Sequence, residues 1–421
     1  MRSPVPIKKN FFRYVPLLIL GLLLLIVYSW GLSRPAEPYF DEVHYVRFIR
    51  GLLNENRFLD TSNVHPPLWH LLTAGAFLAL GDCPIAWRLI SLIAGMILFI
   101  PLFLIARQIT GSKTIAFLTV FLLAFDCISL TQARSAMMNS LMLLFLLWCT
   151  YYFLGAFPPG QGIRRNYYCC CGLFLGLAIA TKLVSLSLYL FLLPLLMLEW
   201  YKRKNERGLL VRDAGIFLLV IPALCFAASY LFVPFLKDRG WHDIWGIWRF
   251  HMNYNLTMDQ THGYSSRWWS WPLMLRPIWF YFSAQRWGNP HAMMSGILCI
   301  GNPGIFWMMP VAVLNLALLC IFRKSRAAGI ILLGFLTQWL CFGLARRLQF
   351  FHYFYSVMPF TVMAMALLAR QLWEWNGFWR VLVVVYLIAV AVMFVYWYPF
   401  LTGIPVSGDY YNNHIWFKSW I

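Results

Sequence analysis

Residues 14–32 read YVPLLILGLLLLIVYSWGL, and the acidic pair Asp41-Glu42 follows this segment after a short connection. The segment is long enough to cross a bilayer, because about 20 residues at about 1.5 Å per residue span a hydrocarbon core of about 30 Å. Carboxylates this close to a membrane are costly unless they are paired or used. The stretch therefore predicts a membrane protein with a functional acidic pair just past its first span.

The composition of the whole chain also indicates a membrane protein. Hydrophobic residues make up 61% of the 421 residues and charged residues 12%, whereas an ordinary soluble domain has about 25% charged residues. The net charge of +19 comes from Lys and Arg that are dispersed in short loops, which favours membrane topology and lipid contact over nucleic-acid binding. We predict an all-α polytopic membrane protein in contact with membrane lipids, with no nucleic-acid partner.

The apolar runs predict eleven transmembrane helices. They cover residues 14–33, 87–106, 114–131, 136–156, 168–183, 185–200, 213–236, 297–322, 328–345, 352–370 and 379–399. A further run, 68–80, is too short to cross unaided and follows two prolines, which favour a first helical turn. We expect it to be a partly embedded outer helix. With the amino terminus inside, the inner segments then hold 18 of the 34 Lys and Arg residues, as the positive-inside rule requires.

This topology places two long segments, 34–86 and 237–296, on the outer side of a single membrane domain that covers residues 1–421. Polar residues at the ends of the spans fall on the same side. They are Arg88, Asp126, Arg134, Asn139, Lys182, Arg346, Arg347 and His352. Their collection on one face predicts one polar cavity that opens outward.

The acidic pair begins an amphipathic pattern. Apolar residues from Val43 to Leu53 recur at helical spacing, which predicts a helix on the membrane surface. Asp41 could simply cap this helix. Adjacent helical residues point about 100° apart, so we expect Asp41 and Glu42 to have different tasks. The chain has no second acidic cluster beside this pair. We therefore predict no metal site and no firm cofactor, with a divalent ion as the less favoured alternative.

Several motifs together resemble the protein O-mannosyltransferases, which use a dolichyl- or polyprenyl-phosphate mannose donor. Asp41-Glu42 is similar to their first-loop acidic pair, and Arg88 resembles the arginine that opens their second span. The other matching motifs are His65-Pro66-Pro67-Leu68, Phe125-Asp126, Gln132-Ala133-Arg134-Ser135, Thr181-Lys182-Leu183-Val184, His262-Gly263-Tyr264-Ser265-Ser266, Trp269-Ser270-Trp271-Pro272, Gly301-Asn302-Pro303 and Phe351-His352-Tyr353-Phe354. The resemblance covers roughly residues 38–190 and 260–360.

The chain departs from the family pattern at three places. Asn139 stands where the family usually has Asp, Trp69-His70 where Gly-Lys is common, and Ser185 where Gly is common. The second outer loop lacks a soluble β-trefoil insertion, so the chain resembles a short bacterial form. The resemblance implies a GT-C glycosyltransferase fold in a bacterial inner (plasma) membrane, with the site facing the periplasm or exterior and a dimer as an option.

The chemistry that this resemblance implies assigns roles to named residues. A sugar phosphate leaves as an anion, so the enzyme must deprotonate the acceptor hydroxyl and neutralise the departing charge. We expect Asp41 to be the general base toward a Ser or Thr hydroxyl of a protein, with Glu42 in support. The expected donor-phosphate ligands are Arg88, Arg134, Lys182, Arg346 and Arg347, and the expected substrate contacts are His65, Asp126, His352 and Trp269. A single displacement would invert the anomeric centre.

Simpler interpretations compete with each assignment. Arg134 and Lys182 could snorkel to the interface, Arg88 could pair with Asp82, and Arg346-Arg347 could be ordinary interfacial charge. The two histidines could be structural, and the tryptophans an aromatic belt. Two other functions also compete: a lipid-linked sugar transferase that acts on lipid A or another glycolipid, and a lipid or solute transporter, although we find no internal repeat of the kind transporters often have.

Overall fold

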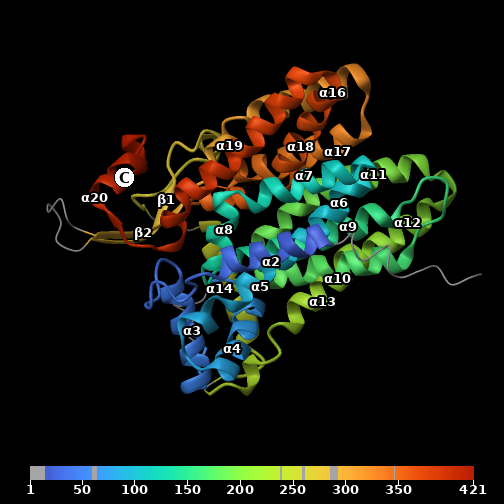
Figure 1. Cartoon of the computed structure of the whole chain (residues 1–421). Helices are drawn as coiled ribbons and strands as arrows, with labels where there is room; N and C mark the ends of the chain where they lie inside the picture. The colour runs from blue at the N-terminus through green and yellow to red at the C-terminus, as the bar shows by residue number, and fades with distance from the viewer. Residues whose placement is uncertain (1–14, 59–63, 238, 258–260, 285–292, 346) are drawn as a thin grey trace, which may run out of the picture.

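The apolar runs form helices because a chain segment in lipid must pair its backbone N–H and C=O groups internally. The computed structural model describes residues 15–421 except 59–63, 238, 258–260, 285–292 and 346. Long helices run side by side in a bundle, and the shorter helices and a small sheet lie at one end of it (Figure 1).

Each of the eleven predicted spans contains helix. The helices are α2 (Val15–Ser29), α5 (Pro84–Ile97), α6 (Phe99–Thr110), α7 (Lys113–Ala124), α8 (Cys127–Arg134), α9 (Asn139–Ala156), α10 (Arg165–Thr181), η2 (Leu183–Leu188), α11 (Tyr189–Lys202), η3 (Lys204–Glu206), α12 (Arg207–Ala214), η4 (Gly215–Val220), α13 (Ile221–Ala228), η5 (Val233–Phe235), α15 (Pro303–Phe306), α16 (Met309–Arg323), α17 (Arg326–Leu340), η7 (Cys341–Leu344), η8 (Phe351–Ser356), α18 (Met358–Trp375) and α19 (Gly377–Thr402). Within the described residues, seven helical stretches are long and apolar enough to cross a membrane, or eight if the bent pair α7–α8 is one span.

The pair α7–α8 bends by 63° at Asp126. The Asp126 carboxylate accepts a hydrogen bond from the Ser129 amide at 3.2 Å and so caps α8. It also accepts one from the Asn302 amide at 3.0 Å, which joins α8 to the start of α15. Asp126 is therefore a structural residue at a helix break, and not the substrate contact that we expected.

The second outer segment contains a sheet that we did not predict. Strand β1 (Ile278–Ala284) pairs antiparallel with β2 (Met293–Cys299), with Ile278 opposite Cys299, and β2 pairs with the short β3 (Val406–Ser407). The predicted span 297–322 therefore starts too early, since its helices begin at Pro303. Residues 297–299 are apolar because they pack against α8 and α19.

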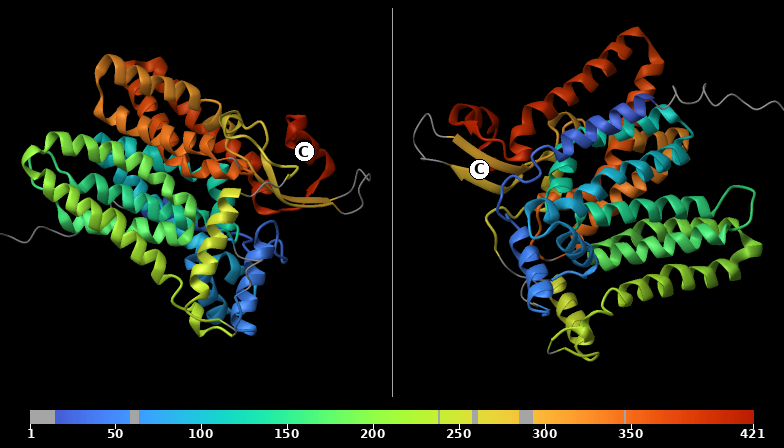
Figure 2. Two further views of the ribbon diagram at one scale, coloured as in Figure 1. Left: turned by 180° about the vertical axis from the view of Figure 1, so that it is seen from behind. Right: turned by 60° about the horizontal axis from the view of Figure 1, so that its bottom comes forward.

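The remaining helices lie with the sheet at the same end of the bundle (Figure 2). They are α3 (Glu42–Asn54), α4 (Leu68–Leu80), α14 (Asp243–Thr257), η6 (Trp268–Leu273), α20 (Gly408–His414) and η9 (Lys418–Trp420). The amphipathic pattern of α3 holds for most of the helix, because Val46 and Ile49 are buried while Arg47 and Arg50 are exposed. Val43, expected on the apolar face, is exposed. The short apolar helix expected over residues 68–80 is also confirmed as α4.

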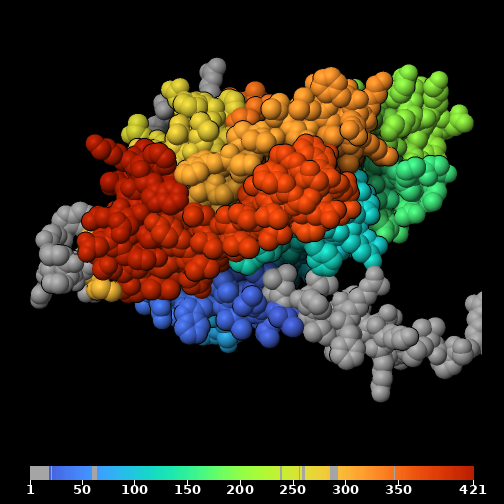
Figure 3. All heavy atoms as spheres, turned by 45° about the horizontal axis from the view of Figure 1, so that its top comes forward, coloured from blue at the N-terminus to red at the C-terminus, as the bar shows by residue number. Residues whose placement is uncertain are grey.

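One helix of the bundle is bare along most of its length. In the space-filling view, α19 and the chain after it lie at the surface across the middle and left of the face shown (Figure 3). Its exposed side chains include Val381, Val385, Ile388 and Val392. An exposed apolar row of this length fits contact with lipid rather than water.

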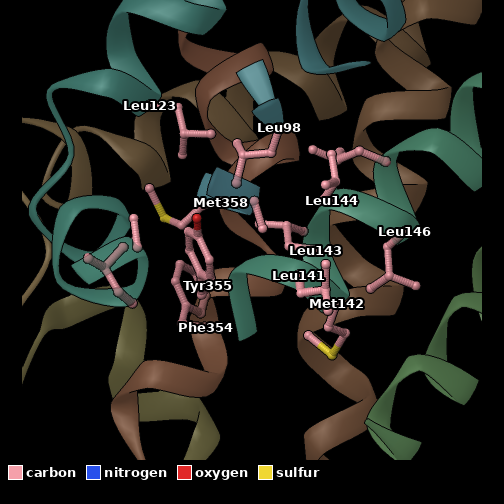
Figure 4. Packing of buried hydrophobic residues seen from close by; sticks show 14 of the residues in the cluster. Leu98, Leu123, Leu141, Met142, Leu143, Leu144, Leu146, Phe354, Tyr355 and Met358 are labelled. Carbon is pink, nitrogen blue, oxygen red and sulfur yellow. The ribbon is translucent and has the colours of Figure 1, made fainter. Parts of the chain in front are cut away.

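The core lies around α9, where Leu141, Leu143 and Leu144 point toward neighbouring helices (Figure 4). Nearby, α5 and α8 approach closely: a Cβ added at Gly95 would lie 2.4 Å from the Cβ of Ala133. Only glycine allows this approach. It fixes α8, which ends with Arg134, against α5, which carries Arg88.

Candidate active site

Glu42 is held entirely by protein groups. Its carboxylate forms an ion pair with Arg88 at 2.9 Å, and both side chains are 0% exposed. It also accepts hydrogen bonds from the Ala136 amide at 2.6 Å and the Tyr39 amide at 3.4 Å. With the second Arg88 N–H, which donates at 3.1 Å, the carboxylate has four donors and no solvent contact, so it has no acceptor capacity left for substrate. Glu42 thus fixes the start of α3 against the segment after α8.

Arg88 is committed in the same way. Beyond Glu42, its guanidinium donates to the carbonyl oxygens of Leu32, Arg34, Pro35 and Glu37 at 2.8 to 3.3 Å. These bonds tie the connection between α2 and α3 to α5. Arg88 was expected to bind the donor phosphate, but its N–H groups already donate to protein oxygens, so the structure indicates a structural role.

The alternative pairing of Arg88 with Asp82 is wrong. Asp82 accepts hydrogen bonds from Arg50 at 2.7 Å and from the Trp87 indole at 2.7 Å. Arg134 is likewise internal: it is buried and donates to the carbonyl oxygens of Tyr28 at 2.7 Å and Gly31 at 2.9 Å. It joins α8 to the end of α2 and lines none of the cavities described below, so neither snorkelling nor phosphate binding describes it.

Asp41 is oriented differently from its neighbour. It occupies the cap position of α3, yet its side chain makes no capping hydrogen bond. Its partner within the described residues is the Tyr45 hydroxyl, which donates at 3.4 Å. Burial raises the pKa of Asp41, while Lys182 and then His44 oppose that shift. A half-buried carboxylate with only one long hydrogen bond is a ready proton acceptor.

Asp41 lines a cavity of about 420 Å³ between the outer segments and the bundle. Its lining includes Lys182, Arg347, His65, His352 and Tyr353 as well as His44, Tyr254 and His262. Asp41 is the only carboxylate among these described lining residues. Asp41 and Lys182, which are 141 positions apart in the chain, thus meet in one chamber. Of the polar residues expected to share one cavity, the chamber is lined by Lys182, Arg347 and His352 but not by Arg88, Asp126, Arg134 or Asn139.

Lys182 reaches this chamber because α10 ends at Thr181 and the backbone becomes extended at Lys182. A cation at a helix carboxyl end is favoured by the helix dipole. The ammonium donates to the Asn139 side-chain oxygen at 2.8 Å, and Asn139 in turn donates to Gln132 at 2.7 Å. Asn139 is a neutral partner, so this hydrogen bond orients the ammonium without forming an ion pair.

Arg347 faces the same chamber from the segment between η7 and η8. It donates to the Asn255 side chain and, at 3.1 Å, to the Tyr353 hydroxyl. The centre of the Tyr353 ring lies 5.0 Å from the Lys182 ammonium and 5.9 Å from the Arg347 guanidinium carbon. Two cations held against one ring create a site for an anion. Arg346, also expected here, lies outside the described residues.

A second cavity of about 230 Å³ adjoins the first. It shares Lys182, Arg347, His352 and Tyr353 with the Asp41 chamber. Its other walls are mostly apolar and come from α9, η2, η7 and η8; they include Met142, Leu183, Val184, Leu186, Phe342 and Tyr355. Exposed Leu186 and Leu344 lie on the η2 and η7 segments that border it. The cation pair therefore stands where a polar chamber meets an apolar one.

A third hollow of about 550 Å³ is open and polar. It is lined by residues of the second outer segment, among them Ser265, Arg267 and Trp269, and it shares Arg347 and Leu348 with the Asp41 chamber. Trp269 is half exposed here and thus lies beside the chamber rather than in it.

The two expected histidines both line the Asp41 chamber. His352 is buried and its Nδ1 has no hydrogen-bond partner among the described residues. Burial, and then the charge of Lys182 and Arg347, lowers the pKa of His65 well below its ordinary value, so His65 is a neutral group at pH 7. Asn255 was missed, because an asparagine on a predicted loop carries no motif; only its contact with Arg347 reveals it.

No cluster of three or more His, Cys, Asp or Glu side chains suited to a metal ion occurs within the described residues.

Two family models match most of the chain. The C-terminal four-transmembrane region of protein O-mannosyltransferase matches residues 240–420, and dolichyl-phosphate-mannose-protein mannosyltransferase matches residues 64–230. The polyprenol-phosphate-mannose–protein mannosyltransferase of Mycolicibacterium smegmatis is 26% identical over 96% of this chain and 92% of its own length. The enzyme of the same name from Corynebacterium glutamicum is also 26% identical, with the same coverage.

Solved structures show the fold. The protein O-mannosyltransferase complex of S. cerevisiae bound to the sugar donor matches with a TM-score of 0.82 at 13% identity, over 100% of this chain and 93% of that chain. ArnT from Cupriavidus metallidurans bound to undecaprenyl phosphate matches with a TM-score of 0.63 at 16% identity, over 92% and 77%. The fold is that of the GT-C glycosyltransferases.

Proposed function

Because the chain belongs to the protein O-mannosyltransferase family, we propose that it transfers mannose from a polyprenyl- or dolichyl-phosphate donor to Ser or Thr hydroxyls of proteins, with inversion at the anomeric carbon. One observation carries the proposal. A carboxylate with a raised pKa, Asp41, shares a chamber with the cations Lys182 and Arg347, and that chamber adjoins an apolar one.

The reaction is a single displacement. The acceptor hydroxyl oxygen bonds to the anomeric carbon as the bond from that carbon to the phosphate oxygen breaks. The hydroxyl proton passes to the Asp41 carboxylate, and the polyprenyl phosphate leaves as an anion. The raised pKa of Asp41 makes it a stronger base than an ordinary aspartate, which favours proton transfer.

The departing charge is met by Lys182 and Arg347, which Tyr353 and Asn139 hold in position. These donors are in place before reaction, which is the condition for electrostatic stabilisation of a leaving anion. Loss of one such donor typically lowers kcat by about 10²- to 10³-fold. Glu42 and Arg88 act at a distance by fixing the α3 start that presents Asp41.

The apolar chamber suits the first isoprene units of the donor. Its walls pair a cationic end at Lys182 with Leu183, Val184 and Leu186, which matches a phosphate followed by a hydrocarbon chain. Exposed Leu186 and Leu344 beside it give a lipid-facing side from which such a chain can enter laterally.

Purified protein with polyprenyl-phosphate mannose and a Ser/Thr peptide tests the proposal directly. We expect an α-mannosylated peptide, because displacement of a β-linked donor inverts the anomeric centre. A parallel arm with lipid A as the acceptor tests the alternative acceptor class. Transfer to lipid A with none to peptide would refute the protein acceptor.

The chain is an integral multi-pass membrane protein, and its orientation and assembly belong to the proposal. The positive-inside rule supports a chamber that faces the exterior of a bacterial plasma membrane. The yeast relative is a complex of two chains, which supports a dimer for this chain. Cysteine labelling from outside intact cells and light scattering in detergent test the two points.

A further inference from the structure

The open polar hollow beside the Asp41 chamber shares Arg347 with that chamber, but its other lining residues have no part in binding the donor as proposed above. Its floor is already ordered. The Ser266 amide donates to the Gln349 carbonyl at 3.0 Å, and the Gln349 side chain donates to the carbonyls of Phe342 at 2.6 Å and Ala345 at 3.1 Å. Trp268 packs edge-to-face on Trp339 at 5.4 Å. Such a preformed surface can bind a ligand without the loss of conformational entropy that ordering a flexible surface would require.

The charge of the hollow has one sign. Its lining includes Arg267 and Arg347 and, among the described residues, no carboxylate. The sequence contains no Asp or Glu between residues 260 and 373, so both segments that form the hollow, 265–269 and 343–349, lack carboxylates. Within the described part of the chain, the exposed Arg267 guanidinium forms no ion pair or hydrogen bond. The hollow is thus complementary to an anionic ligand that arrives from outside.

The position of the hollow identifies that ligand as the acceptor. Arg347 and Leu348 line both the hollow and the Asp41 chamber, so a chain whose hydroxyl reaches Asp41 continues into the hollow. The donor's hydrocarbon suits the apolar chamber instead. Arg267 lines this hollow, so an extended peptide that leaves the Asp41 chamber through it, at about 3.3 Å per residue, passes Arg267. Half-exposed Trp269 adds a surface for the peptide backbone.

We propose that this hollow binds the flank of the acceptor peptide, and that Arg267 selects acceptors with Asp or Glu a few residues from the modified Ser or Thr. The inference rests on the proposed function. An exposed ion pair contributes only modestly to binding. Gaining one with an acidic flank and incurring like-charge repulsion with a basic flank give a preference of about tenfold in kcat/KM, which added salt reduces.

Three peptides with one Ser/Thr core and Asp, Ala or Lys at the flanking positions test the inference with full-length protein. We expect wild type to prefer the Asp over the Lys peptide, Arg267→Gln to lose the preference and Arg267→Glu to reverse it. Arg107, exposed at the carboxyl end of α6, provides the matched control: Arg107→Glu should keep the wild-type preference. The ratio between peptides is independent of the fraction of folded enzyme.

Three results would overturn the inference. The first is equal kcat/KM for all three peptides with wild type, which leaves the proposed function intact. The second is an Arg267→Glu protein that loses activity equally on all three peptides, which would remove Arg267 from selectivity. An Arg267→Glu protein that changes only its response to anionic lipid in vesicles would equally overturn the inference, because the hollow would then bind lipid. Absence of transfer to any peptide by wild type would instead count against the proposed function itself.

Discussion

One substitution in the Glu42–Arg88 ion pair can distinguish a structural role of Arg88 from a role in binding the donor. Arg88→Leu removes the partner of a carboxylate that is 0% exposed and leaves the carbonyls of Leu32, Arg34, Pro35 and Glu37 without their shared donor. Breaking a buried ion pair from one side costs about 3–5 kcal/mol. We expect Arg88→Leu to lose that much of the free energy of unfolding, which is a large part of the stability of a typical protein.

Arg50→Leu is the matched control. Arg50 pairs with Asp82 at 2.7 Å, but the two side chains are 44% and 41% exposed, and exposed pairs contribute about 0–1 kcal/mol. Thermal unfolding in detergent should therefore show a large fall in Tm for Arg88→Leu and a small one for Arg50→Leu.

A second measurement distinguishes a structural Arg88 from a phosphate ligand. Donor KM measured on the folded fraction of Arg88→Leu should match wild type, because Arg88 lines neither chamber. Adding Glu42→Leu removes the unpaired carboxylate, so the double variant should recover part of the lost stability. An Arg88→Leu protein with wild-type stability and a strongly raised donor KM would refute this reasoning.

Three further predictions concern the chambers. Asp41→Asn should lower kcat by about 10²–10⁴-fold with no change in Tm, and a fully active variant would contradict the general-base role. In wild type, kcat/KM should rise with pH as Asp41 loses its proton. The midpoint should lie above the ordinary value of about 3.9, because burial raises the pKa of Asp41. Lys182→Met should lower kcat by about 10²–10³-fold, measured by single-turnover transfer, and unchanged kcat would remove Lys182 from the phosphate site. Val184→Trp should fill the apolar chamber and raise the KM of a long-chain donor more than that of a short-chain one; equal effects would place the hydrocarbon elsewhere.

The sequence by itself determined the membrane class, the helical segments and the position of Asp41 at the start of an amphipathic helix. These follow from local properties: an apolar run long enough for the bilayer must form helix whatever its neighbours are, and the amphipathic spacing of α3 requires only the residues within it. The motifs around Asp41, Lys182 and His352 likewise predicted residues that line the chamber, because each motif is a short run of neighbouring residues that can be read directly from the sequence.

Only the tertiary structure decided which charges line a cavity and which are enclosed by protein. Arg88 and Lys182 look alike in sequence, as single cations at the ends of spans, yet one is enclosed by Glu42 and four carbonyls while the other faces a chamber. The same holds for Asp126, which a helix break turned into a cap, and for Asn255, which Arg347 recruits from 92 positions away. The reason is that a charge acts through its burial and its partners, and these partners come from distant segments whose approach no local pattern encodes.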